Sequence, residues 1–592
     1  MRRAHLADRV SLFVGAAIAV GVPVVFLGIF FLYPTLSLIF RGFVDEAGVW
    51  DLGGFSEVLA KPRIWRAIRF TLGLSAVATF FSLLLGIPGA WVLYRLDFKG
   101  RSFIRGLVAV PFVLPSVVVG VAFRTLFSEG GLLGFLGLDG TATAVVVGMV
   151  FFNYSLAVRT IGNLWVRLDP RMEEAARSLG ASPLRVFFAV TLPRLLPAIS
   201  AAGALIFLFC ATSFALVLIL SGTSVSTVET EIYFLTTGLL DLRSAAVLSI
   251  VQLLVIGISL WISKRAQSYG AKTQKLRVDV PPRRVSLADW PVVGFTAVVV
   301  GGLLVLPLGN LFLASLRRKG QWTFANYTDL FVPKAVRVLK DPAIYALGRS
   351  FSIALMAMLI ALVVGVLVAI VLSRRPQQRS LKWGLSGLDV LFALPLGVSA
   401  VTVGFGFSIA LDEPPFDFRN SWWLVPLAQA MVAVPLVVRL VTPVLEQIDR
   451  RQLEVARVLG ASWLRVLAQV ELPLVSRSIG LAAAFSCAMS LGEFGATSFV
   501  ARSTEPTLPL VIYRLVGKPG AAEQGLALAA SVVLALVAAA LMVAAEAWFD
   551  RPQKVVPVIQ PERNTPKSVA SSLTEAERNT PTSFSQRKDF SG

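Results

Sequence analysis

The feature that most limits what this chain can fold into is a series of long apolar runs across its first 548 residues. About 20 apolar residues in a row can cross a lipid bilayer as a helix, which satisfies its own backbone hydrogen bonds where water is absent. By this criterion the sequence predicts about 12 transmembrane helices, near residues 11–33, 67–93, 106–127, 142–166, 197–220, 243–263, 291–315, 345–373, 384–411, 422–445, 477–500 and 524–548. We therefore expect an all-α polytopic protein that lies in a lipid bilayer.

Composition supports a membrane protein and argues against a nucleic-acid-binding one. Only 15% of the residues are charged and 56% are hydrophobic, whereas soluble proteins carry about 25% charged residues. The net charge of +20 is divided among short loops between apolar runs, as in Arg95, Lys99, Arg101 and Arg105. That distribution is typical of cytoplasmic loops, and a nucleic-acid footprint would be one continuous basic face. We expect no nucleic-acid partner.

Residue types for metal or covalent chemistry are scarce. Cys210 and Cys487 each stand alone inside an apolar run, and the single histidine, His5, lies in a polar segment near the N-terminus. Neither a metal-ligand spacing nor a disulfide framework can be built from them. The sequence predicts no metal site and no catalytic residue.

A semi-polar segment occurs twice, as "EEAARSLGASPLRVFFAVTLPRLLP" at 173–197 and "EVARVLGASWLRVLAQVELPLV" at 454–475. An offset of 280 residues pairs Glu174 with Glu454, Gly180 with Gly460, and Pro193 with Pro473. It also pairs Leu114-Pro115 with Leu394-Pro395 and Ile232-Tyr233 with Ile512-Tyr513. One register over such a distance indicates an internal repeat. Each half carries an even number of predicted spans, so the halves cross the membrane in parallel and form a pathway at their interface.

The domain boundaries follow from this repeat. We expect a first half at 1–263, a basic linker at 264–290, a second half at 291–548 and a disordered tail at 549–592. The first apolar run is too long for a signal peptide and is expected to be a retained anchor. The basic linker places the termini on the cytoplasmic side under the positive-inside rule, although the predicted external loop at 316–344 is also basic.

Each repeated segment, called a cassette here, is predicted to form a helix, a glycine turn and a second helix on the cytoplasmic side. In the first cassette Gly180 suits the left-handed position after a helix, and Ser182 can cap the next helix, with Pro183 in its first turn. The small apolar face consists of Met172, Ala175, Ala176 and Leu179. Such a face favours docking into a groove of another protein. The alternative is a helix that only lies on lipid, which usually carries bulkier residues.

These residues resemble the EAA loop of ABC importer permeases, in which Glu-Ala-Ala is followed by Gly and later by Leu-Pro. The matching stretches are "EAARSLG" with "LP" at 192–193, and "EVARVLG" with "LP" at 472–473, where Val455 stands in place of the usual Ala. The resemblance implies two MetI-like permease domains with EAA loops at 170–197 and 449–477. It assigns ATPase coupling to Glu174, Ala175, Ala176, Gly180, Glu454, Ala456 and Gly460.

The same resemblance implies partners and a location. It predicts two copies of a cytoplasmic ABC ATPase subunit, an extracytoplasmic substrate-binding protein, and the bacterial plasma (inner) membrane. The chain itself has no phosphate-binding loop: its one Gly-Lys pair, Gly517-Lys518, precedes Pro519 and has Ile512 where a Gly is required. We therefore expect no enzyme activity and no cofactor in this chain, with ATP bound by the partner subunit.

Polar residues within the spans are candidates for the substrate pathway. The sequence points to Glu493 in "MSLGEFGATSFV", to its repeat partner Ser213, and more weakly to Asn153. A structural hydrogen-bonding role for Glu493 is an equal alternative. Pro115 and Pro395 are predicted to break or kink their helices.

The substrate is the least determined feature. "FFNYSLAVR" at 151–159, "TVETEIY" at 227–233 and "SLGEFGATSFV" at 490–500 resemble thiamine permeases and their ferric-iron relatives. The resemblance implies a thiamine importer, with ferric iron as the alternative. A secondary transporter remains the competing class, although that mechanism does not call for paired cassettes.

Overall fold

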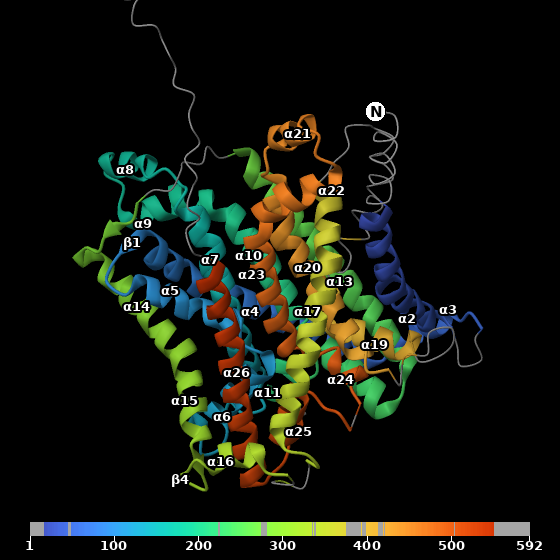
Figure 1. Cartoon of the computed structure of the whole chain (residues 1–592). Coiled ribbons are helices and arrows are strands. Elements are labelled where there is room, and N and C mark those ends of the chain that lie inside the picture. The colour runs from blue at the N-terminus through green and yellow to red at the C-terminus, as the bar shows by residue number, and fades with distance from the viewer. Residues whose placement is uncertain are drawn as a thin grey trace, which may run out of the picture. The chain divides into compact units, whose positions relative to one another are not determined.

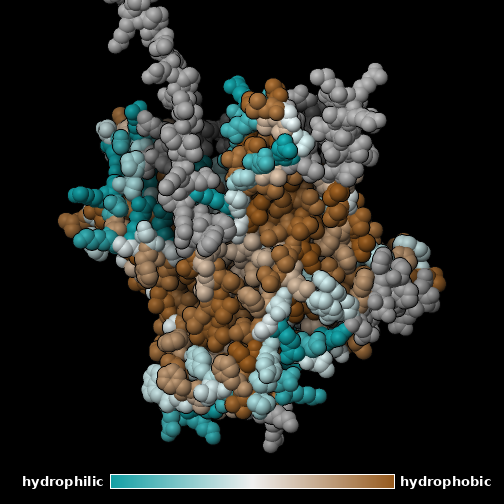
Figure 2. Space-filling model, in the orientation of Figure 1, coloured by the Kyte–Doolittle hydropathy of each residue, from teal (hydrophilic) through white to brown (hydrophobic). Residues whose placement is uncertain are grey.

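The computed structural model describes residues 17–44, 49–222, 225–273, 281–333, 336, 339–373, 392, 398–411, 418, 421–502 and 504–549. The predicted tail at 549–592 lies almost wholly outside these residues. The described part is nearly all helical, as the sequence predicts, with two pairs of two-residue strands. Figure 1 shows the helices running between two ends of one bundle, with the cassette helices at its upper end. Apolar side chains cover the middle of the visible face (Figure 2), as expected for a surface in contact with lipid.

The elements of the first half follow in chain order. They are η1 (Gly28–Leu32), α2 (Tyr33–Phe43), α3 (Leu52–Ala60), α4 (Pro62–Arg95), β1 (Leu96–Asp97), α5 (Arg101–Ala109), η2 (Val110–Phe112), α6 (Ser116–Phe127), η3 (Gly134–Leu136), α7 (Ala142–Trp165), α8 (Arg171–Ser178), α9 (Pro183–Val186), η4 (Phe187–Thr191), α10 (Leu192–Ala211), α11 (Ala215–Leu220), α12 (Val228–Phe234), η5 (Leu235–Leu239) and α13 (Leu242–Thr273).

The second half repeats this order with small differences. Its elements are β2 (Arg283–Arg284), η6 (Leu287–Asp289), α14 (Trp290–Val300), η7 (Gly301–Val305), α15 (Leu306–Ser315), β3 (Arg317–Arg318), β4 (Gln321–Trp322), α16 (Ala325–Thr328), η8 (Asp329–Phe331), α17 (Ala343–Ser373), α19 (Ala400–Ala410), α20 (Leu424–Glu446), α21 (Arg450–Val458), α22 (Trp463–Val466), η10 (Leu467–Glu471), α23 (Leu472–Leu491), α24 (Thr497–Val500), α25 (Leu508–Val516) and α26 (Ala521–Phe549).

Among the described residues, ten helices are long and apolar enough to cross a membrane, and one bent pair raises the number to eleven. The bent pair is the predicted third span, where 101–112 and 116–127 meet at 102°. Pro115 lies at the bend as the N-cap of α6, with φ of −56° and ψ of 133°. Its ring removes the N–H that would continue the preceding helix, which ends before it. The predicted ninth span, with Pro395, lies mostly outside the described residues, apart from α19.

The predicted fifth and eleventh spans, at 197–220 and 477–500, are wrong as continuous helices. Each helix begins earlier, runs through a π turn, and ends at Ala211 or Leu491. A polar break follows, and then the short helix α11 or α24. An apolar window cannot detect such a break, because the residues around it are as apolar as a helix in lipid.

The repeat extends to the first span, with a different offset. The π turn η1 and Pro34 in the first half correspond to η7 and Pro307 in the second, 273 residues later. The connection between first and second spans is therefore seven residues longer in the second half. Each of these spans packs against the broken helix of the opposite half, α2 against α19 and α15 against α6. These two contacts cross from one half to the other and hold the halves together.

The linker makes contact with the first half. β2 pairs in parallel with β1, and Arg283 binds both carboxylate oxygens of Asp289 at 2.8 and 2.7 Å. The guanidinium of Arg283 also lies 5.5 Å from the ring centroid of Trp91. The start of the second half is thereby fixed beside the end of α4.

Close packing between α4 and α7 in the first half depends on glycine. A Cβ added at Gly86 would lie 2.5 Å from the Cβ of Ala157, and one at Gly162 would lie 2.3 Å from the ring of Tyr94. Small residues at such positions let helix backbones approach closely within a membrane.

We predict that Gly86→Leu destabilises the chain by about 1–3 kcal/mol, because overpacking forces α4 and α7 apart. Gly73→Leu on the same helix is the matched control, since no atom lies within 4 Å of a Cβ at that position. Thermal unfolding of both purified variants in detergent measures the difference. Equal midpoints for the two variants would contradict the packing argument.

Candidate functional site

Both cassettes fold by the same local devices. Asp169 accepts a hydrogen bond from the N–H of Arg171 at 3.1 Å, and Asp449 accepts one from the N–H of Arg451 at 3.0 Å, so an acid binds a free N–H at the start of each first helix. Gly180 and Gly460 follow those helices in the left-handed conformation, with φ of +82° and +86°. The paired bonds of a Schellman turn, Ala181 N–H to Ala176 C=O and Gly180 N–H to Arg177 C=O, close the first of them.

The second helix of the first cassette starts as the sequence predicts. Ser182 accepts a hydrogen bond from the N–H of Arg185 at 3.4 Å, and Pro183 occupies the first helical position. This helix continues through η4 into α10 without leaving helical geometry. Each cassette is therefore covalently part of a long helix that enters the bundle.

The residues predicted for ATPase coupling lie at one end of the bundle, on α8 and α21 and in the turns after them (Figure 1). Glu174, Ala175, Gly180, Glu454 and Gly460 are exposed, whereas Ala176 and Ala456 are half-buried. The leucines before the two glycines are among the most exposed large apolar residues, 89% for Leu179 and 82% for Leu459. Each cassette thus presents an apolar side chain that the described part of the chain leaves exposed.

The two cassettes differ in one polar contact. In the first, the hydroxyl of Thr191 donates to Glu173 at 2.9 Å, linking α8 to η4. In the second, the repeat partners are Leu453 and a buried acid, Glu471. The acid thus lies on the cassette helix in the first half and on the long helix in the second half. The two cassettes are therefore not chemically identical.

Asn153, the weaker pathway candidate, lies on α7 inside the first half. Its side-chain amide donates to the C=O of Met149 at 2.8 Å and to the sulfur of Cys210 at 3.3 Å. It thereby links α7 to α10. A role for Asn153 in the pathway stays a prediction.

Glu493 and Ser213 occupy the two breaks after the long helices. The carboxylate of Glu493 is buried and accepts hydrogen bonds from the N–H of Ala496 at 2.7 Å, the N–H of Thr497 at 3.0 Å, and the hydroxyl of Thr497 at 2.5 Å. It therefore caps α24, which is the structural alternative considered from the sequence. Ser213 is half-buried, and its N–H donates to the C=O of Cys210 at 3.2 Å.

Immediately after these two residues, Phe214 stacks on Phe494. Their ring centroids are 5.5 Å apart and their planes 19° from parallel. These residues are repeat partners, separated by 280 positions. In a two-fold arrangement, a residue that contacts its own counterpart must lie at the axis. The stack therefore marks the pseudo-two-fold axis between the halves.

Two further repeat partners flank this stack in matching ways. Tyr233 lies 5.3 Å from Phe214 and Tyr513 lies 5.2 Å from Phe494, centroid to centroid, with interplanar angles of 59° and 58°. We call Phe214, Phe494, Tyr233 and Tyr513 the axial cluster. These four residues were not among the candidates predicted from the sequence, although the 280-residue register pairs all of them.

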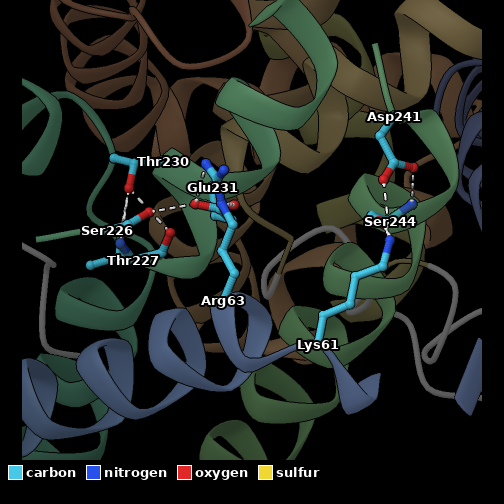
Figure 3. Close-up of polar contacts among 8 residues, drawn as sticks. All are labelled: Lys61, Arg63, Ser226, Thr227, Thr230, Glu231, Asp241 and Ser244. Atoms are coloured by element: carbon cyan, nitrogen blue, oxygen red, sulfur yellow. Dashed lines mark hydrogen bonds and ion pairs between the residues drawn. The ribbon is translucent and has the colours of Figure 1, made fainter. Parts of the chain in front are cut away.

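Helix α12 carries two acids that were not among the candidates predicted from the sequence. Glu229 is fully buried and accepts hydrogen bonds from Gln252 at 3.1 Å and from Ser399 of the second half at 2.8 Å. Glu231 forms an ion pair with Arg63 and accepts from the hydroxyl of Ser226 at 2.7 Å. In Figure 3, Arg63 reaches from α4 to Glu231, beside Lys61 reaching to Asp241. Both acids stand in a short polar stretch of the sequence, which does not distinguish them from loop residues.

Comparison with known proteins agrees with this architecture. Residues 82–268 and 361–552 each match the family described as "Binding-protein-dependent transport system inner membrane component". The thiamine transport system permease protein ThiP of Brucella abortus is 26% identical over 513 residues, covering 83% of this chain and 90% of the relative. The sulfate transport system permease protein CysT of Salmonella typhimurium is 33% identical over 215 residues, covering 35% of this chain and 76% of the relative.

A solved structure is also similar, that of a bacterial ABC transporter involved in the import of the acidic polysaccharide alginate. It aligns at a TM-score of 0.38 and 19% identity, over 46% of this chain and 100% of that chain. The two family matches lie one in each half of the repeat and together span most of the chain. This chain therefore belongs to the binding-protein-dependent transport system inner membrane component family, as an ABC importer permease with both halves fused in one polypeptide.

Proposed function

We propose that this permease carries thiamine across the bacterial inner membrane. The observation that carries the proposal is the similarity to a thiamine permease over 83% of the chain. The chemistry of the interface supports it, since thiamine is a cation and the residues beside the axis include the buried acids Glu229 and Glu493. Neither acid has a basic partner among the described residues, and a buried acid of this kind favours a positively charged ligand.

Two copies of an ATPase subunit are proposed to bind at the two cassettes. Family membership implies an ATPase and a substrate-binding protein as partners. The number two follows from the two cassettes, whose exposed leucines offer a small apolar surface at each site. ATP would be bound by those subunits. The cassette end and both termini would then be cytoplasmic, and the substrate-binding protein would dock at the opposite end.

The proposed pathway runs along the interface of the halves, where parallel repeats place a substrate route. Ser213 and Glu493 lie next to the axial stack and are proposed to border it. Asn153 is proposed to support the first half through its bond to α10.

Ferric iron remains the alternative cargo from the sequence resemblance, because a metal cation would also favour acids. Sulfate is the cargo named for one relative, but an anion beside Glu229 and Glu493 would be repelled.

We predict that the double variant Gly180→Val, Gly460→Val abolishes import while the protein still reaches the membrane. Valine is strained at positive φ, so both cassette turns must change shape, although no atom lies within 4 Å of either added Cβ. Uptake by cells and the amount of ATPase that co-purifies measure the effect.

Gly130→Val is the control for backbone strain alone. Gly130 has a φ of +85°, also with no neighbour within 4 Å, and lies outside the cassettes. Near-normal uptake and ATPase recovery in the double variant would contradict the coupling role.

A transport experiment tests the cargo. A strain lacking thiamine import, given this gene together with its ATPase and binding protein, is expected to regain uptake of labelled thiamine, while uptake of ferric iron and sulfate stays at background. Restored iron uptake alone would reassign the cargo and leave the architecture unchanged. An ATPase-inactive partner serves as the control for leakage.

A further inference from the structure

The axial stack is where the two halves meet along their shared axis. Phe214 is 5% exposed and Phe494 is 2% exposed, so the rings exclude solvent between the halves. A substrate that follows the axis cannot pass rings in van der Waals contact. The stack therefore closes any central route at this level.

Chain breaks surround the stack. Phe214 and Phe494 each follow the end of a long helix, and the bend at Pro115 meets the break of the second half. A Cβ added at Gly492 would lie 2.8 Å from the Cβ of Pro115. Short segments between breaks can rotate without bending a long helix, because only a few backbone torsions must change.

The tyrosines at the two sides of the axial cluster are only partly covered. The two tyrosines are half-buried, unlike the two phenylalanines. Phe499 contacts Tyr233 edge-on at 5.6 Å between centroids. If the phenylalanines separate, the surfaces that line the gap are therefore aromatic faces from both halves.

Two buried acids lie near these rings without a basic partner. Glu229 is one helical turn from Tyr233 on the same face of α12, and Gln252 links it to the C=O of Ala211, just before the first break. Glu493 directly precedes Phe494. In the described part of the chain, the hydrogen bonds of both acids come only from hydroxyl, amide and backbone donors. Glu231, by contrast, has Arg63.

We propose that the axial cluster is the gate of the pathway and that, when it opens, its aromatic faces bind an aromatic organic cation whose charge is balanced by Glu229 and Glu493. Cations are attracted to the faces of aromatic rings, more strongly when water is excluded. Aromatic groups of a ligand replace the ring contact that is lost when the phenylalanines part. The choice of ligand rests on the proposed function, whereas the gate does not.

Crosslinking tests the gate. In a chain with Cys210→Ser and Cys487→Ser, the pair Phe214→Cys, Phe494→Cys is oxidised in the assembled transporter. The expected disulfide abolishes uptake and its coupling to ATP hydrolysis, and a reductant restores both. Peptide mass spectrometry confirms the bond.

The matched control is Phe123→Cys, Phe151→Cys. These two rings also have centroids 5.5 Å apart, but both lie within the core of the first half. Their disulfide is expected to leave uptake unchanged. Full uptake with the axial disulfide formed would overturn the gate.

Ligand protection tests the second part. Ser213→Cys, in the same cysteine-free background, is labelled with a thiol reagent while ATP and vanadate hold the transporter in a trapped state. Thiamine is expected to slow labelling, whereas thiochrome, a neutral aromatic, and choline, a cation without a ring, are expected not to. Equal protection by thiochrome would show that a positive charge is not needed and would contradict the role of the acids. Equal protection by choline would show that a ring is not needed and would contradict the role of the aromatic faces.

The acids are tested in the same assay. Glu229→Gln and Glu493→Gln, each made separately, are expected to raise the thiamine concentration for half protection by about tenfold or more. Glu231→Gln on the same helix is the control and should leave that concentration unchanged. Unchanged protection in both test variants would overturn the assignment of the acids. If cells with the native chain import no thiamine, the cargo is wrong, but the axial crosslink still decides the gate through ATPase activity.

Discussion

The constraint on which this structure depends is the need to pair every backbone polar group inside a lipid bilayer. Long helices without interior proline, such as α17 and α26, meet it without help. The breaks at Pro115 and after Ala211 and Leu491 do not, and the second-half break uses the Glu493 carboxylate to accept hydrogen bonds from two buried N–H groups at the start of α24. Non-helical backbone is tolerated at membrane depth only where protein or water surrounds it. The breaks are therefore found between the halves, where a transport pathway also has to be.

The repeat places equivalent residues at equivalent positions in the two halves, and the acids occur at positions where the two halves differ. The axial aromatic residues are identical in both halves, which is what a symmetric closure requires. The acids are not: Glu229 and Glu231 have Pro509 and Val511 as repeat partners, and Glu493 has Ser213. One half thus contributes acids from α12 and the other from its break. A small organic molecule has no two-fold symmetry, so an asymmetric set of polar groups around a symmetric barrier suits it better than a duplicated one.

Much of the architecture could be predicted because periodic and local sequence patterns determine it. Apolar length predicted the spans, the 280-residue register predicted the repeat, and the glycine and Ser-Pro signals predicted the cassette turns at Gly180 and Ser182. Pro115 predicted a break for the same local reason. The ends of the long helices at Ala211 and Leu491 were missed because the flanking segments are equally apolar. The exchange of α2 and α15 between halves depends on packing, which no sequence window contains.

The site was only partly predictable for a related reason. Glu493 was visible as an acid in an apolar run, but its cap on α24 depends on a break that hydropathy does not reveal. Glu229 and Glu231 stand in a short polar stretch, and burial alone distinguishes them from loop residues. The register pairs Phe214 with Phe494, but only the structure shows that their rings touch and that they therefore lie on the axis.

The same register suggests how the two ends of the molecule communicate. Pro183 to Ala211 forms one continuous helix, so the turn at Gly180 and the break before Phe214 are the two ends of a single element. The second half repeats this arrangement from Gly460 to Phe494. A helix transmits displacement along its length because its backbone hydrogen bonds resist bending. A movement imposed at either cassette is therefore carried along the helix toward Phe214 and Phe494, the ring pair that we propose as the gate.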